Sequence, residues 1–179
     1  MKRLLLLTSV LLLTGCLNVV VNQQLHRDST VDTAITFTAD PFVLKGFENL
    51  TVNPELSDRF SYAENNGSVT YSFSRISVNS SLFKGSSGVF PGQTYTLEKR
   101  FFFLFYYYKY TIQLTGESSL SQFKGVANLT YVVKGFGSVS QTSGKKLDSS
   151  TVEFDVSPFE SSTNTVEFRD FFITNWFSK

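Results

Sequence analysis

The chain has 179 residues, with 16 Lys and Arg against 15 Asp and Glu, one Cys and one His. This near-neutral balance and a hydrophobic content of 41% exclude a disordered tail, a collagen-like fibre and a broadly basic nucleic-acid-binding protein. One Cys excludes an internal disulfide and a multi-cysteine metal site, and one His excludes a His-rich metal cluster. We therefore expect one globular domain with no metal, no cofactor and no nucleic-acid partner.

The first sixteen residues have the pattern of a secretion signal. Lys2 and Arg3 precede an apolar run over residues 4–13. Ten residues rise only about 15 Å as a helix, half the roughly 30 Å core of a bilayer, so the run is too short to span a membrane. Residues 13–16, with the sequence Leu-Thr-Gly-Cys, resemble the lipobox of prokaryotic lipoproteins. The alternative is an ordinary signal peptide with an incidental Cys16.

The lipobox resemblance implies that residues 1–15 are a signal peptide and that Cys16 is lipidated at the mature N-terminus. Residues 16–179 would then form a single domain, exported from the cytoplasm and lipid-anchored at the cell membrane or the outer membrane. No Gly/Ser or Pro-rich linker follows Cys16. We therefore expect the domain to sit close to the membrane.

Beyond Cys16 the apolar residues recur with a period of two, which predicts β-strands. We expect an opening hairpin turning at residues 28–30 and a second hairpin turning at Asn66-Gly67, because Asn-Gly tolerates the positive φ of tight turns. A change of parity predicts a bulge near Ser74-Arg75. Residues 80–93 read as a loop. Later strands are expected at residues 126–133, 139–141, 151–156 and 165–173.

Residues 40–62 interrupt this pattern. Asp40 and Asn53 each precede a proline, as capping residues often do at the start of a short helix. The first helix would end at Gly46, and in the second Leu56 and Phe60 would share a face. The sequence therefore predicts an α+β fold, mainly an antiparallel β-sheet with one or two short helices near residues 41–61. A structured loop is the competing interpretation.

A four-residue pattern, Thr-Val-Glu-Phe, occurs at residues 151–154 and again at residues 165–168. Val and Phe point one way in such a strand, and Thr and Glu point the other. The pattern predicts two strands of one antiparallel meander with a solvent-exposed face.

The most unusual segment is residues 94–115, which include three consecutive Phe and three consecutive Tyr. As one strand it would extend about 70 Å, so it must turn or bend. Folding it about Phe103-Leu104 places Glu98 opposite Lys109, which is a favourable cross-strand pair. The same register pairs residues 97 with 110, 96 with 111 and 95 with 112. Against this hairpin, Phe103-Leu104 contains none of the residues that tight turns favour.

Three interpretations of this aromatic segment remain open. We favour a buried strand whose aromatic side chains fill the core. The second is an apolar hairpin tip that enters a lipid surface, with Lys99, Arg100 and Lys109 at the headgroup level. The third is an aromatic groove for a protein partner or an apolar ligand. The candidate membrane or partner contacts are Phe101, Phe102, Phe103, Leu104, Phe105 and Tyr106.

The sequence offers little support for catalysis. A Ser–His–acid triad would have to use His26, beside an expected turn, which is more typical of an ordinary surface histidine. Glu153 and Asp155 share a strand face but have no third ligand in view, so a solvated face is favoured over a cation site. We expect no catalytic residues and no enzyme activity.

Four segments resemble the LppM-like envelope lipoproteins. They are residues 15–21, 131–139, 142–144 and 151–154, which follow that family's order of strands and Gly-containing turns. Phe136 departs from the pattern, in which Pro usually precedes the glycine. The resemblance implies an α+β envelope domain with lipid-associated binding and transfers no site residues. We therefore expect a non-enzymatic envelope lipoprotein with a binding or structural role at the membrane surface. The alternative is a surface adhesion or assembly module that recognises a protein partner.

Overall fold

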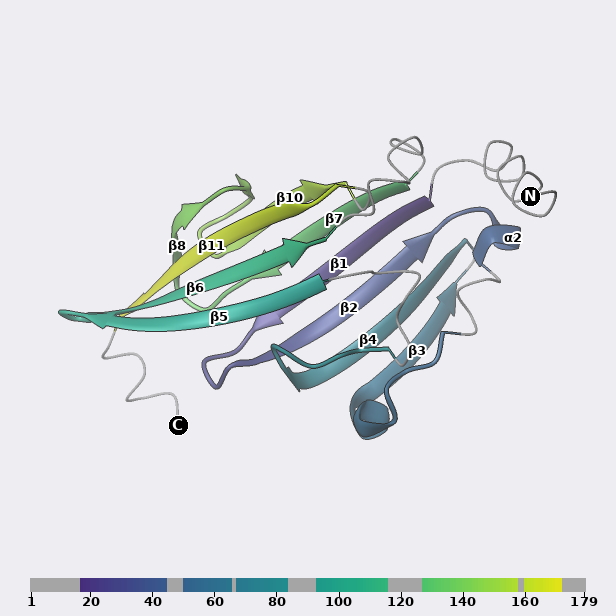
Figure 1. Ribbon diagram of the computed structural model, residues 1–179, viewed down its shortest axis with the longest axis horizontal. Helices are drawn as coiled ribbons and strands as arrows, with labels where there is room; N and C mark the ends of the chain where they lie inside the picture. The colour runs from purple at the N-terminus through teal and green to yellow at the C-terminus, as the bar shows by residue number, and fades with distance from the viewer. Residues whose placement is uncertain are drawn as a thin grey trace.

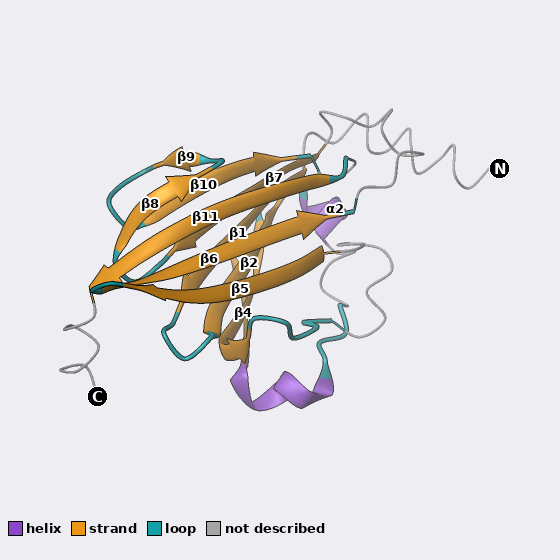
Figure 2. Cartoon of the chain, turned by 60° about the vertical axis from the view of Figure 1, so that its left-hand side comes forward, coloured by secondary structure: helices purple, strands orange, loops and turns teal. Residues whose placement is uncertain are grey.

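The computed structural model describes residues 17–44, 50–65, 67–83, 93–115, 127–157 and 160–171. Within these ranges the chain forms two layered β-sheets (Figure 1). Figure 2 shows the same strands in orange, after a turn of the molecule about the vertical axis. The expected signal peptide and Cys16 lie outside the described residues, as do Gly46 and most of the expected loop at 80–93. None of the described helices has the length and apolar character needed to cross a bilayer.

The expected α+β class is wrong, because the described chain is mainly β and none of its helices reaches seven residues. The helical segments are α2 (Pro41–Leu44) and the 3-10 turn η1 (Pro54–Arg59). Asn53 caps η1 as expected, since its side chain accepts a hydrogen bond from the Glu55 N–H. Phe60 already has extended backbone angles and starts the next strand. The turn therefore ends before Leu56 and Phe60 can share a helix face.

The larger sheet has the strand order β3-β4-β2-β1-β7-β10-β9. Its strands are β1 (Leu17–Leu25), β2 (Thr30–Thr38), β3 (Phe60–Asn65), β4 (Ser68–Ser77), β7 (Ala127–Lys134), β9 (Lys145–Lys146) and β10 (Thr151–Val156). The pairing of β1 with β7 is parallel, and the other pairings in this sheet are antiparallel. Period-two alternation predicts which face of β1 is buried, but it carries no information about a parallel neighbour more than a hundred residues away.

The predicted turns and the predicted bulge of this sheet are confirmed. The β1–β2 turn is closed by Asp28, whose carboxylate accepts a hydrogen bond from the Thr30 N–H at 3.1 Å. Gly67 has φ +80 between β3 and β4, a conformation that glycine adopts without strain. The register of β2 against β4 shifts opposite Arg75, which has φ 52.

The smaller sheet has the strand order β5-β6-β11-β8. Its strands are β5 (Gln93–Phe102), β6 (Phe105–Leu114), β8 (Ser138–Thr142) and β11 (Ser162–Phe171). The expected meander of residues 151–156 with 165–173 is wrong, because β10 lies in the larger sheet and β11 in the smaller one. Val152 and Phe154 are nevertheless buried, as are Val166 and Phe168. Both copies of the pattern face a core, but they do so from different sheets.

Two polar contacts join the sheets along β1. The Tyr110 hydroxyl, fully buried, donates to the Gln23 side chain at 3.0 Å. Four residues further along the chain, in the turn that follows β1, Arg27 forms a salt bridge with the buried Asp170 at 2.8 Å. Asp170 pairs with Tyr106, which lies four residues before Tyr110. Four residues from β1 into the turn that follows it therefore match four residues of β6, so β1 and β6 run along the same axis.

Candidate functional site

The most distinctive surface lies at the β5–β6 turn, which projects from one end of the molecule (Figure 1). The predicted register is confirmed: Glu98 pairs with Lys109, and the ladder continues to Phe102 opposite Phe105. On the other side of β6, Phe171 pairs with Phe105. We define the aromatic tip as the exposed apolar residues gathered here: Phe101 (55% exposed), Phe102 (72%), Phe103 (77%), Leu104 (43%) and Phe171 (37%).

The favoured core interpretation is wrong for this end of the segment. Phe101 to Leu104 are exposed, and Phe105 and Tyr106 are half-buried. The core interpretation holds only further along β6, where Tyr108, Tyr110, Ile112 and Leu114 are buried. Figure 1 shows that the β5–β6 turn extends past the end of β1. The strand that faces the rest of the hairpin therefore does not reach the turn.

The turn is made without the residues that such turns favour. Phe103 has φ 58, in the left-handed region, which costs a non-glycine residue about 1 kcal/mol or more. A glycine or asparagine would relieve this cost, while a buried aromatic contact would offset it. Phe103 is 77% exposed, so contacts of its ring with the rest of the domain offset little of this cost. An exposed aromatic side chain held at a strained position is a candidate for a functional contact.

Cationic side chains stand one or two residues behind the aromatic tip on both faces of the hairpin. On one face, the Lys99 ammonium lies 4.2 Å from the centre of the Tyr106 ring. On the other face, Arg100 pairs across the ladder with Tyr107, and Tyr107 pairs with Arg169. Successive residues of a strand point to opposite faces, which explains the division between Lys99 and Arg100.

The positive charges of Arg100 and Arg169 are only partly compensated by neighbouring groups. Arg100 contacts Glu98 at 3.2 Å, and the Arg169 guanidinium lies 5.0 Å from the centre of the Phe105 ring. Lys109, expected at a headgroup level, sits one row further back between Glu98 and Glu167. Lys109 therefore lies between two carboxylates, and the cations next to the tip are Lys99, Arg100 and Arg169.

Sequence reasoning missed two members of this surface, Arg169 and Phe171. They lie more than sixty residues from the turn and reach it only through the pairing of β11 with β6. A signal was present, because Arg169 and Phe171 repeat the spacing of Arg100 and Phe102 on one strand face. Alternation alone could not indicate that the two pairs would lie side by side.

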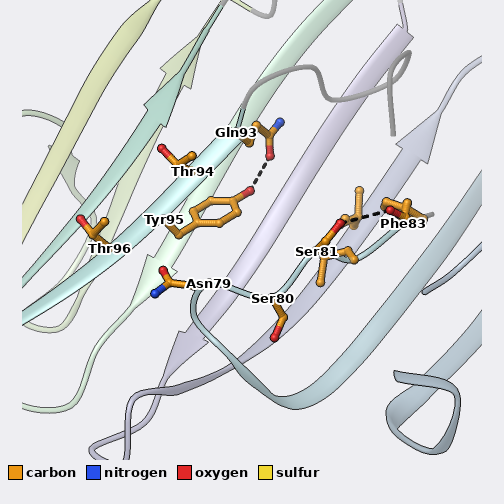
Figure 3. Close-up of a pocket in the computed structure, with 10 residues that line it drawn as sticks. Asn79, Ser80, Ser81, Phe83, Gln93, Thr94, Tyr95 and Thr96 are labelled. Carbon is orange, nitrogen blue, oxygen red and sulfur yellow. Dashed lines mark hydrogen bonds between the residues drawn. The ribbon is translucent and has the colours of Figure 1, made fainter. Parts of the chain in front are cut away.

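A separate pocket of about 460 Å³ lies beside the free edge of β5. Figure 3 shows its lining, which combines apolar and uncharged polar side chains: Ile35, Asn79, Ser80, Ser81, Leu82, Phe83, Gln93, Thr94, Tyr95 and Thr96. A second, more open pocket of about 360 Å³ lies on the larger sheet. Residues 101–106 line neither pocket, so the expected aromatic groove is not formed by them at either place.

The ionisable group of the first pocket is Tyr95, whose hydroxyl contacts Gln93 and lies 3.2 Å from the Tyr131 hydroxyl. Burial raises the pKa of Tyr95 to about 12, and burial holds the pKa values of Tyr110 and Tyr131 well above their usual value. These phenols stay protonated near neutral pH. The pocket lining suits an uncharged ligand and offers no group that exchanges protons at that pH.

His26 forms a pair with a carboxylate, with 2.9 Å between His26 Nε2 and Asp32 Oδ2. The other oxygen of Asp32 accepts the Arg75 N–H at 2.7 Å, at the bulge between β2 and β4. Burial alone would raise the pKa of Asp32, but the hydrogen bonds from Arg75 and His26 outweigh it and lower that pKa. The pair thus secures the bulged strand beside the β1–β2 turn.

The carboxylates of β10 have local partners. Glu153 lies 3.5 Å from the Lys145 ammonium, and Asp155 accepts a hydrogen bond from Thr130 at 2.9 Å. Within the described ranges, three or more His, Cys, Asp or Glu side chains nowhere gather as a metal site would require.

Comparison with solved structures identifies a similar fold. The folded domain of LppM from Mycobacterium tuberculosis, determined by NMR, aligns over 88% of this chain and 92% of its own length with a TM-score of 0.56. The two chains share a fold. At 17% identity the likeness is one of architecture, and it agrees with the LppM-like resemblance of the sequence. No protein-family model and no curated protein matches the sequence.

Proposed function

We propose that this protein is a non-enzymatic envelope lipoprotein, anchored through Cys16, that binds an anionic lipid surface with its aromatic tip. The observation that carries the proposal is the exposure of Phe102 and Phe103 at the end of a hairpin whose next residues are cationic. The lipobox-like residues 13–16 support the anchor, and the fold shared with the LppM domain supports an envelope role.

The energetics favour a weak but specific contact. Complete burial of a Phe or Leu side chain contributes about 1.5–3 kcal/mol, so Phe102, Phe103 and Leu104 together supply on the order of 4 kcal/mol when partly immersed. Each basic residue near an anionic membrane adds about 1 kcal/mol, which Arg100 and Arg169 would provide. The tip would be a secondary contact, and stable anchoring would come from the acyl chains on Cys16.

Vesicle sedimentation tests the tip directly. The mature chain carrying Cys16→Ser, which lacks the anchor, should bind vesicles containing phosphatidylglycerol better than vesicles of phosphatidylcholine alone. Leu104→Ser should reduce this binding several-fold, whereas Leu147→Ser is the matched control, since Leu147 is a leucine of equal exposure outside the tip (45% against 43%). Equal binding by both variants would refute lipid contact by the tip and leave recognition of a protein partner as the better function.

The charge requirement and the anchor have their own tests. Replacing Arg100 and Arg169 together with Gln should abolish the preference for anionic vesicles while leaving the weaker binding to neutral ones. In cells, Cys16→Ser should abolish fatty-acid labelling and membrane retention. Unchanged labelling of that variant would exclude Cys16 as the acylated residue.

A further inference from the structure

The anchored end and the aromatic tip lie at opposite ends of the molecule. β1 starts at Leu17 and runs toward the end from which the β5–β6 hairpin projects (Figure 1). Contacts along the interface agree with the picture, because Gln23 meets Tyr110 and the later Arg27 meets Asp170, close to the tip. Cys16 is bonded to Leu17, so an anchor on Cys16 would attach at the end far from the tip.

The separation is large compared with what the anchor can bridge. Leu17 is six residues from Gln23, and Phe103 is seven residues from Tyr110, the contact of Gln23. At about 3.3 Å per residue these two stretches add up to roughly 40 Å. Leu17 already belongs to β1 and pairs with Ala127. No flexible linker therefore separates the anchor from the folded domain.

The aromatic tip is built to enter a bilayer with the hairpin end-on. Its rings project from both faces, since Phe101 pairs with Tyr106 while the next residue, Phe102, faces the opposite side. The cations behind it also occupy both faces, with Lys99 on one and Arg100 on the other. A hairpin lying flat would immerse only one of these faces, whereas an end-on hairpin immerses all the rings and leaves all the cations at the headgroups.

The faces that a flat orientation would press against lipid are polar. Behind the cationic row, the outer face of the smaller sheet carries the charged row of Glu98, Lys109 and Glu167, followed by a row of threonines. The outward positions of β1 in the larger sheet are mostly polar, including Asn18, Asn22 and Gln24, all three of which are exposed. These surfaces offer a bilayer little apolar area to gain, so they disfavour lying flat.

Resting on the lipid contact proposed above, we infer that the tip binds a second bilayer facing the one that holds Cys16. With the hairpin end-on in a membrane, Leu17 stands roughly 40 Å from that membrane, a distance that the directly attached anchor does not cross. The domain then acts as a short rigid spacer between two lipid surfaces. The facing surface carries the anionic headgroups that Arg100 and Arg169 contact.

The test uses the acylated protein purified from membranes and reconstituted in phosphatidylcholine vesicles. Protein-free target vesicles containing phosphatidylglycerol are added, and clustering is followed by light scattering. We expect clustering with anionic targets, at least a several-fold loss with Leu104→Ser, and no loss with Leu147→Ser. Targets of phosphatidylcholine alone should give little clustering, which also controls for association between copies of the protein.

A second measurement reports which membrane the tip enters. The chain has one Cys. Acylation of Cys16 therefore leaves Leu104→Cys as the only free thiol for an environment-sensitive fluorophore. In protein reconstituted in anionic vesicles that are kept too dilute to meet one another, this fluorophore should stay in a water-like environment. It should become shielded when an excess of anionic target vesicles is added. Shielding without targets, and no clustering, would overturn the spacer while preserving the lipid contact. No shielding under any condition would remove both.

Discussion

Substituting Phe103 separates the stability of the hairpin from its proposed use. Phe103 has φ 58 and is 77% exposed, so two opposing effects decide the outcome of Phe103→Asn. Relief of the left-handed backbone strain should stabilise the fold by about 1 kcal/mol, since Asn tolerates this region. Loss of the small buried part of the ring should cost less than about 1 kcal/mol at 25 cal/mol per Å². We expect a net change between zero and about 1 kcal/mol of stabilisation.

Denaturant titration with linear extrapolation measures this change, and a thermal melt should show a rise of no more than about 2–4 °C. Phe102→Asn is the matched variant, because Phe102 is equally exposed but lies in β5 without a positive φ. Phe103→Asn should be the more stable of the two by about 1 kcal/mol or more, while both should weaken vesicle binding. A loss of 2 kcal/mol or more in Phe103→Asn would refute the reasoning, since it would mean that the ring packs against the domain.

Four further tests address the packing and the polar contacts. Phe168→Ala, at a fully buried position, should cost about 3–5 kcal/mol in a denaturant titration, and a loss below 1 kcal/mol would contradict its place in the core. Gly67→Val should destabilise by about 1 kcal/mol or more in a thermal melt; the cause would be φ +80 alone, because a Cβ there meets nothing within 4 Å. Asp170→Asn should lower the free energy of unfolding by about 1–3 kcal/mol, because it leaves the partly exposed Arg27 without its counter-charge. In a double-mutant cycle, Asp170→Asn combined with Arg27→Gln should cost less than the sum of the two single changes. Asp32 has a folded pKa below its unfolded value of about 4, so its stabilising effect is present above that pH and is lost as the pH falls through the folded pKa. Asp32→Asn should therefore make the free energy of unfolding depend less steeply on pH at the acid end. An unchanged dependence would exclude this contribution.

Local rules predicted the local features of this fold and failed where distant segments meet. The register of β5 against β6 followed from four cross-strand pairs that agree, with Glu98 opposite Lys109 among them, because complementary neighbours make alternative registers costly. The bulge at Arg75 followed from a change of parity. The repeated Thr-Val-Glu-Phe pattern gave a wrong strand pairing. A period of two predicts that Val152 and Val166 are buried, but it does not predict which sheet buries them.

The exposure of the aromatic tip was harder to predict than the strand register, for a physical reason. Turn statistics argued against a turn at Phe103-Leu104, and that objection favoured the buried strand. The chain makes the turn there regardless, with the strain held at Phe103. Composition rules describe what is favourable for folding, and Phe103 departs from them. The lipid contact proposed above would account for this departure.

The parallel pairing of β1 with β7 has a consequence for how the chain matures. Leu17 pairs with Ala127, so the first strand completes its place in the sheet only after most of the polypeptide has been synthesised. Closing so long a segment is entropically costly and slows folding. Until β7 arrives, one edge of β1 keeps its backbone hydrogen-bonding groups unpaired. The export proposed above would require an extended polypeptide in a translocation channel. The delay would suit it, because the sheet cannot be completed before β7 has emerged.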